Sequence, residues 1–365
     1  MPRRPPAIHA YPGHRNGQRV ELTARVFRRA PAPVARTGRR ARLAALWSIW
    51  GTHEWADAGV ALAGPGFLGE ARSDAEGFVR FDLPCSRALP PHARWERARL
   101  WLPAHPDVPV VRAHILAPGR DGRLGVISDL DDTVLVTGRI GPRNWRRLLL
   151  QGPAERQAVP GARALFDALA ERPDTVDEAG EWPVARFGRP PTPVAEADTA
   201  PAPGRPFFYV SSSPWNLHGY LTEFLALNGF PAGVFELRDW GLDRATFGTT
   251  SHGTHKGERI AHILGFHPEL RFVLIGDDGQ GDVLAYAHAV EQEGERVAGV
   301  FIRSTAQGSL SAAEASAVEA MRAAGTPVFV GPIWDAGVDM ARALGLPSPV
   351  DGPTDLRVAE PSPPG

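Results

Sequence analysis

The feature of the sequence that most constrains the fold is an alternation of short apolar runs with amphipathic helical patterns after residue 120. Such an alternation favours a parallel sheet with helices on both faces. We therefore predict an α/β fold, a Rossmann-like parallel sheet, within a domain at residues 118–346. The runs that indicate buried strands lie at 124–127, 207–210, 233–237, 271–275, 297–302 and 327–330. The helical patterns lie at 160–171, 217–228, 256–264, 283–290 and 312–324.

The first third of the chain has a different pattern, in which apolar and polar residues alternate with a period of two. Residues 20–26 show it most clearly, and the period is typical of a half-buried strand. Further runs at 59–63, 77–83, 95–102 and 108–116 predict a small β-sandwich accessory domain at residues 18–117. It contains no catalytic constellation, so that packing and docking to a partner both remain open as its role.

Three segments have the composition of flexible chain. Residues 1–17 form a polar, proline-rich basic tail, and residues 347–365 form a second proline-rich tail. Residues 173–206 contain eight prolines among 34 residues, which predicts a flexible insertion without a core of its own. We place no functional site in residues 173–206.

Charge and cysteine content limit the compartment and the partners. The single cysteine, Cys85, cannot form an intramolecular disulfide, and no run of about 18 apolar residues suggests a membrane span. We expect a soluble cytoplasmic protein. Residues 1–50 nevertheless contain eleven arginines and one acid, Glu21, and residues 39–50 mix arginines with tryptophans. That stretch either contacts an acidic membrane peripherally or packs on its own domain; nucleic acid is not an expected partner, and the oligomeric state is open.

Acidic residues gather directly after the strand predicted at 124–127, where Asp129, Asp131, Asp132 and Thr133 follow one another closely. In open α/β sheets, ligands bind at the carboxyl ends of the strands. Carboxylates this close repel one another, and a cation or a bound proton is needed to hold them together. The stretch indicates a site for Mg²⁺ and phosphate, the alternative being a polar turn after a strand.

Polar residues follow other predicted elements in the same way. Ser211 follows the strand at 207–210, and Asp277 to Asp282 follow the strand at 271–275. Lys256 is the only lysine among 40 basic residues, which suggests that a compact ammonium is needed there, unless it survived by chance. His252 and His255 precede it, and without a cysteine or a third nearby ligand we expect them to lie in a loop and bind no metal.

The order of these motifs resembles that of the haloacid-dehalogenase-type phosphatase superfamily. The sequence segments around these motifs resemble the catalytic domain of the actin-patch-associated phosphatidate phosphatases and their bacterial relatives. These segments are SDLDDTVLVTG (128–138), FFYVSSSPWNL (207–217) and LIGDDGQGD (274–282). The resemblance covers roughly residues 118–345. It departs from the family pattern at Ser212, where Asn is usual, and at Asp278, where Ser is usual; an additional carboxylate at Asp278 bears on metal or substrate preference.

The resemblance implies a haloacid-dehalogenase-like fold and a role for each motif. Asp129 is the expected nucleophile, forming an aspartyl-phosphate, and Asp131 the general acid and base. Phosphate-binding roles fall to Ser211, Lys256 and Thr133, although Thr133 alternatively holds the turn and Asp132 caps the following segment. The expected Mg²⁺ ligands are Asp129, the backbone carbonyl of Asp131, Asp277 and Asp282.

The expected reaction is Mg²⁺-dependent hydrolysis of a phosphomonoester, foremost phosphatidate to diacylglycerol. No cap domain is evident between residues 216 and 256, and an open site suits a phosphate at a bilayer surface. Two alternatives stay open. One is a phosphatase of a soluble phosphomonoester or a phosphoprotein, and the other is a lipid- or partner-binding adaptor with a vestigial phosphatase fold.

Overall fold

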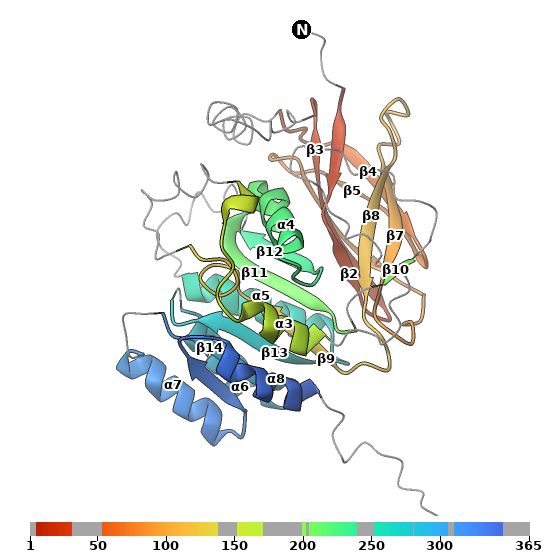
Figure 1. Cartoon of the computed structure of the whole chain (residues 1–365). Coiled ribbons are helices and arrows are strands. Elements are labelled where there is room, and N and C mark those ends of the chain that lie inside the picture. Colours follow the sequence, from red (N-terminus) through yellow and green to blue (C-terminus); the bar gives the residue numbers. More distant parts are fainter. Residues whose placement is uncertain are drawn as a thin grey trace, which may run out of the picture.

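The computed structural model describes residues 5–30, 53–137, 152–170, 199–201, 204–238, 252–279, 281–305 and 310–345, without the side chains of 199–201 and 252–255. Residues 39–50, 171–198 and 347–365, on which several of the expectations above fall, lie outside these ranges. The described residues form two halves, a curled sheet built mainly from residues 7–117 and a parallel sheet covered by helices (Figure 1).

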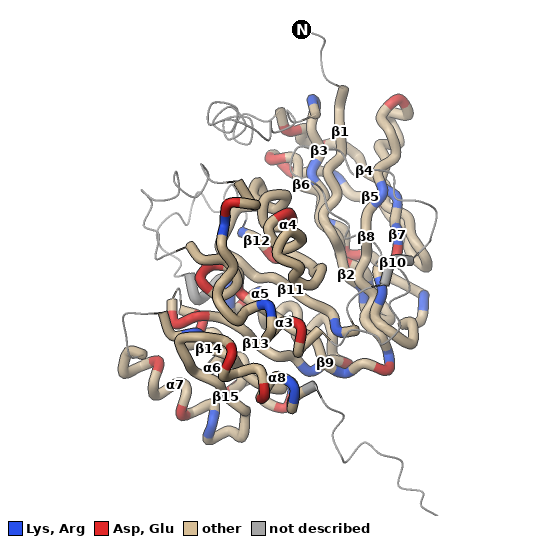
Figure 2. The backbone as a smooth tube through the Cα atoms, in the orientation of Figure 1, with Lys and Arg blue, Asp and Glu red and all other residues tan. Residues whose placement is uncertain are grey.

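The second half is built on a six-stranded sheet in which every pair of neighbouring strands is parallel. Its order is β12-β11-β9-β13-β14-β15, which places β9 between β11 and β13 in the interior. Charged residues on β13 and β14 lie at the strand ends (Figure 2), as burial on both faces requires, whereas β12, at the edge of the sheet, has Glu236 at its centre. The strands are β9 (Leu124–Ser128), β11 (Phe207–Pro214), β12 (Val234–Arg238), β13 (Arg271–Asp277), β14 (Val297–Arg303) and β15 (Val328–Gly331).

Helices cover both faces of this sheet, and two separate apolar cores lie beneath them. One face carries α3 (Ala162–Ala170), α4 (His218–Leu227) and α8 (Val338–Gly345). The other carries α5 (His252–Phe266), α6 (Asp282–Glu293) and α7 (Ala312–Ala323). Short 3-10 helices are η1 (Pro153–Glu155), η2 (Trp215–Leu217), η4 (Gly294–Arg296) and η5 (Asp335–Gly337). The predicted α/β class and the helices on both faces are confirmed; α8 was not predicted.

The first half is one sheet of nine strands among the described residues, ordered β1-β3-β2-β8-β7-β4-β5, with β6 paired to β3 and β10 to β7. It is antiparallel except where β2 meets β8. The sheet curls around an apolar core of its own, and the expected sandwich of two separate sheets is not confirmed. The strands are β1 (Ala7–Ala10), β2 (Gly13–Arg15), β3 (Arg19–Phe27), β4 (Gly59–Gly64), β5 (Phe67–Arg72), β6 (Phe78–Pro84), β7 (Arg94–Trp101), β8 (Val111–Ala117) and β10 (Thr199–Pro201).

Two of the segments predicted to be flexible contribute to the fold. Residues 7–10 and 13–15 are strands, so the prediction of a tail over residues 1–17 is wrong for this part. Their order comes from distant partners, because Tyr11 packs on Trp215 with ring centroids 4.5 Å apart and buried Arg15 donates to Glu96. The end of the predicted insertion likewise pairs with β7 as β10.

The two halves meet along a contact that contains three buried histidines, His14, His218 and His267, which we call the histidine seam. His14 lies on β2 and shares a hydrogen bond of 3.0 Å with His267, which follows α5. His218 begins α4, and its ring centroid lies 4.9 Å from those of Tyr11 and Phe235. Burial lowers the pKa of all three histidines below 6.5. The division into an accessory and a phosphatase domain stays a prediction.

None of the helices in the described ranges combines the length and the hydrophobicity that a membrane span requires. Cys85, the single cysteine, is buried and free.

Candidate active site

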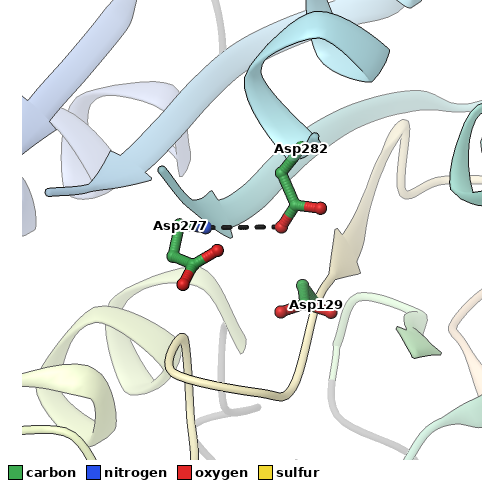
Figure 3. A group of neighbouring side chains, drawn as sticks. All are labelled: Asp129, Asp277 and Asp282. Atoms are coloured by element: carbon green, nitrogen blue, oxygen red, sulfur yellow. Dashed lines mark hydrogen bonds between the residues drawn. The ribbon is translucent and has the colours of Figure 1, made fainter. Parts of the chain in front are cut away.

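The residues singled out at strand ends come together at one edge of the parallel sheet. β9 ends at Ser128 and its neighbour β13 ends at Asp277, with Ser128 opposite Ile275 in the register. Asp129 continues from β9 and its backbone N–H donates to the carbonyl of Ile275 over 2.8 Å. Because parallel strands end at the same edge, Asp129 and Asp277 emerge side by side (Figure 3).

Three carboxylates face one another at this edge. Asp129, Asp277 and Asp282 each offer an oxygen atom, and these atoms lie within 4.8 Å of one another. Asp282 is the first residue of α6, and one of its oxygens also accepts a hydrogen bond of 3.4 Å from the backbone N–H of Asp277. All three residues are at most 4% exposed, so water does little to screen their mutual repulsion.

Lys256 provides the positive charge of this cluster. Its Nζ, carried by α5, lies 2.8 Å from Asp129 Oδ1 and 2.5 Å from Asp282 Oδ1, and the residue is 1% exposed. Burial by itself would lower the pKa of the ammonium, but the charges of Asp129 and Asp282 outweigh it and raise the pKa. Lys256 is therefore protonated and balances one of three carboxylates.

Burial and the negative charge that Lys256 does not balance raise the pKa values of Asp277 and Asp282. Burial, and then repulsion from Asp129, raises the pKa of Asp277 to about 8. Burial also raises the pKa of Asp282 to about 7, against the attraction of Lys256. Apart from the ammonium, Asp129 Oδ1 is buried without a hydrogen-bond donor among the described residues. An all-oxygen group with excess negative charge fits a hard divalent cation such as Mg²⁺.

Asp131 lies beside the cluster and has a different environment. It is half-buried, and its Oδ2 accepts a hydrogen bond of 3.1 Å from the hydroxyl of Ser211. Burial, and then the charge of Asp129, raises its pKa to about 6. A carboxyl group that titrates near neutrality is suited to give and take a proton. Its side chain is outside the three-carboxylate group, and the metal contact expected of its backbone carbonyl stays a prediction.

The hydroxyls expected to bind phosphate are hydrogen-bonded to the two candidate catalytic aspartates, Asp129 and Asp131. Thr133 is fully buried and donates to Asp129 Oδ2 over 3.3 Å. Ser211 donates to Asp131 and accepts from the backbone N–H of Ser213 over 3.0 Å. Both hydroxyls thus orient the candidate nucleophile and acid, and phosphate contact by Ser211, Lys256 and Thr133 stays a prediction.

Two further acids near the site point elsewhere. Asp132 has a left-handed backbone with φ of 54°, and its Oδ1 accepts the backbone N–H of Thr137 over 2.8 Å, which fits the expected capping role. Asp278 accepts hydrogen bonds from the N–H and the hydroxyl of Thr305, at 3.0 and 2.5 Å. Asp278 therefore braces the segment after β14 and is not part of the three-carboxylate group.

The expectation that His252 and His255 lie in a loop is wrong, because α5 already begins at His252. The helix extends four residues before Lys256, and a helix start without an apolar pattern leaves little local signal. Their side chains lie outside the described part of the structure.

Glycine at position 276 is required by a close approach. A Cβ atom there would lie 2.6 Å from Asp282 Oδ2 and 2.4 Å from the hydroxyl oxygen of Tyr286. Both distances are shorter than real contacts of a methyl group allow. The Gly-Asp pair that ends β13 thus lets the start of α6 bring Asp282 up to Asp277.

Two residues that the sequence analysis did not single out also reach the loop after β9. Arg303 Nη1 donates to the backbone carbonyl of Asp132 over 2.6 Å, and Trp334 Nε1 donates to that of Thr133 over 3.0 Å. Arg303 follows the apolar run 297–302, so the strand-end rule that identified Ser211 could have found it. Trp334 has no such signal, because it lies beyond β15 in a short turn.

Comparison with known proteins gives a family for the second half. Residues 124–304 match the family described as "Phosphatidate phosphatase APP1, catalytic domain". Phosphatidate phosphatase APP1 of Saccharomyces cerevisiae is 27% identical over 182 residues, which are 49% of this chain and 26% of the yeast protein. An uncharacterized protein of Schizosaccharomyces pombe is 25% identical over 182 residues, 49% of this chain and 25% of that protein. The match thus spans about a quarter of the length of these curated relatives.

Among solved structures, a carbohydrate acetylesterase from Xanthomonas citri aligns over 80% of this chain and 65% of its own, at 13% identity. The TM-score of 0.22 is too low to support any conclusion about fold or function.

Proposed function

Residues 124–304 of this chain belong to the catalytic-domain family of phosphatidate phosphatase APP1, and we propose that the chain is a Mg²⁺-dependent phosphatase of phosphomonoesters. Phosphatidate, which would yield diacylglycerol, is the proposed substrate. The observation that carries the proposal is the buried group of Asp129, Asp277 and Asp282, whose negative charge Lys256 balances only in part. A haloacid-dehalogenase-like catalytic half forms part of the same proposal.

In the proposed reaction, a carboxylate oxygen of Asp129 attacks the phosphorus atom and forms an aspartyl-phosphate, while the ester oxygen leaves with its bonding electrons. Asp131 donates its proton to that oxygen, so that the alcohol, here diacylglycerol, departs neutral. A water molecule then attacks the aspartyl-phosphate and loses its proton to Asp131, which releases inorganic phosphate and restores both aspartates. The raised pKa of Asp131, about 6, supports its two roles.

Asp129, Asp277, Asp282 and the backbone carbonyl of Asp131 would hold the Mg²⁺ ion. When bound, the ion supplies positive charge that stabilises the negative charge on the phosphoryl oxygens. Lys256 contacts two carboxylates with its ammonium, which has three N–H donors, so one donor is available to a phosphoryl oxygen. The hydroxyl of Ser211, 3.1 Å from Asp131, would turn to another such oxygen.

The lipid substrate is supported by the name of the yeast relative and by the absence of a cap domain between residues 216 and 256 in the sequence pattern. A location in the cytoplasm with peripheral contact to acidic membranes suits such a substrate. The set of Asp129, Asp131, Lys256 and the two acids of the 277–282 loop argues against an adaptor with a vestigial fold, because binding alone requires neither a nucleophile nor an acid.

The test is release of phosphate from a panel of esters by the purified chain, with Mg²⁺ or with EDTA. The panel contains phosphatidate in mixed vesicles, a soluble aryl phosphate, sugar phosphates and a phosphopeptide. We expect Mg²⁺-dependent release, fastest from phosphatidate. Faster release from the soluble esters would reject the lipid and keep the phosphatase, whereas no release from any ester by a folded chain would reject both.

A further inference from the structure

Arg303, the last residue of β14, connects the far side of the site to the loop that carries the candidate nucleophile. In the sheet it lies opposite Asp277, so β13 separates it from β9. Its guanidinium nevertheless reaches the loop after β9, where Nη1 donates to the carbonyl oxygen of Asp132 over 2.6 Å. The Arg303 side chain therefore links the end of β14 to the loop after β9, past the end of β13.

The bond is made at a residue of the loop with an uncommon backbone conformation. Asp132 has φ of 54°, a left-handed conformation that a residue with a Cβ atom rarely adopts. It lies between Asp131, which accepts from Ser211, and Thr133, which donates to Asp129. A change in the Asp132 peptide would therefore turn both candidate catalytic carboxylates away from their present directions.

Another arginine, next to the other end of the same strand, has the contacts of a guanidinium with a purely structural role. Arg296 directly precedes β14 at the opposite edge of the sheet, and it is half-buried like Arg303. Its guanidinium donates to three backbone carbonyls, those of Leu264, His267 and Leu270, and to the carboxylate of Glu293. Such a network is what packing for stability produces.

Arg303 is less well satisfied. Among the described residues it makes a single side-chain hydrogen bond, and its Nε is buried without a partner. A buried donor without an acceptor destabilises the folded state, so stability is a poor reason for an arginine at this position. The one bond that it does make goes to the residue that directly follows Asp131, the candidate acid.

We infer that Arg303 is a positioning residue of the proposed phosphatase, which fixes the Asp132 peptide and through it the directions of Asp129 and Asp131. The inference rests on the proposed function. Because a small misplacement of reacting groups lowers rates by up to about 100-fold, a loss of 10- to 100-fold in kcat is expected without the guanidinium. KM for the ester should change less than threefold, since Arg303 is not placed on the substrate.

The experiment compares R303M with R296M in the full chain. Methionine keeps much of the side-chain volume and removes every donor. R303M should lose 10- to 100-fold in kcat with Tm within about 2 °C of the wild type, because an unsatisfied donor leaves together with a satisfied one. R296M should lower Tm strongly and keep kcat per folded molecule. R303K, whose ammonium can still donate to the carbonyl of Asp132, should recover part of the lost kcat.

Hydrogen exchange provides a readout that does not depend on activity. In R303M the amides of Val134, Leu135 and Thr137, which are bonded within this loop, should exchange at least tenfold faster, while those of β13 stay unchanged. Wild-type kcat and unchanged exchange in R303M would overturn the inference, as would a Tm that falls in step with activity. A wild-type chain that releases no phosphate would reject the proposed function, and exchange would then decide the positioning role alone.

Discussion

The candidate-site cluster of Asp129, Asp277, Asp282 and Lys256 and the histidine seam are both buried groups of polar residues, and burial acts on them in different ways. In the seam, burial lowers the pKa of His14, His218 and His267, so that all three rings are neutral at pH 7 and pack as aromatic groups. In the cluster, Lys256 stays protonated, and its single positive charge lies beside three carboxylates. A buried polar cluster is thus a candidate functional site when the charges of its residues do not cancel. It has a structural role when each of its residues is neutral.

The difference also predicts opposite responses of stability to pH. The pKa values of Asp277 and Asp282 are higher in the folded chain than the usual 3.8, so that the folded state binds the additional protons. The pKa values of the seam histidines are lower than 6.5, so that the unfolded state binds the additional protons. Acid therefore stabilises the metal-free cluster and destabilises the seam.

The largest effect is expected from D129N, which removes the candidate nucleophile from the cluster. Turnover should fall by about 10⁴-fold or more, as in other enzymes that lose a nucleophile, while the fold persists because one of three mutually repelling charges is gone. The measurement is phosphate release from phosphatidate vesicles together with circular dichroism. The control is D167N, which breaks an ion pair with Arg163 on α3 and should keep full activity. Activity in D129N near that of D167N would disprove the assignment.

The next effect concerns stability and Lys256. K256M leaves three buried carboxylates without their ammonium, and the free energy of unfolding in metal-free buffer at pH 8 should fall by about 3–5 kcal/mol. Urea unfolding measures it. The matched control is R259M on the same helix, whose side chain is 42% exposed and lies 3.6 Å from Glu236; it should lose less than about 1 kcal/mol. Equal losses of unfolding free energy in the two variants would show that Lys256 does not offset repulsion among the three carboxylates.

A smaller effect is expected from pH in the metal-free wild type. The stabilisation of the folded state by protonated Asp277 and Asp282 is fully present below pH 3.8. It is lost as pH rises through their folded pKa values of about 8 and about 7. Between pH 6 and 8 the free energy of unfolding should therefore fall by roughly 1.4 kcal/mol per pH unit for each proton released. Saturating Mg²⁺ should flatten this slope, because it keeps the carboxylates ionised in the folded state. A slope unchanged by Mg²⁺ and by D277N would place the titration elsewhere.

The smallest effect belongs to the seam. The contribution of neutral His218 to stability is fully present above its unfolded pKa of 6.5 and is lost as pH falls towards its lower folded pKa. At pH 5.5 this one histidine should therefore lower the free energy of unfolding by about 1.4 kcal/mol. H218L removes two ring nitrogens that have no hydrogen-bond partner among the described residues, and it should remove this share of the acid sensitivity. Urea unfolding at pH 5.5 and 7.5 measures it. H288L, at a side chain 66% exposed, is the control and should leave the pH dependence as it is.

Much of the second half could be predicted because its signals are local. A buried strand in a parallel sheet is apolar along its length, and β9, β11, β13 and β14 were recognised from that property. The same reasoning selected Asp129, Asp277 and Asp282, since parallel strands deliver the residues at their ends to one edge. It could not assign Asp278, because the acceptor role of this residue depends on where Thr305 lies after another strand.

The amino-acid sequence by itself determined the α/β class and the acids and ammonium of the site, because periodicity and strand-end position are properties of neighbouring residues. The tertiary structure alone decided that residues 7–15 are strands, that the first half is one curled sheet, and that Arg303 reaches Asp132. It also assembled the seam from His14 and His267, 253 residues apart. Each of these depends on partners far away in the chain, whose meeting is set by packing and by the burial of backbone and charge.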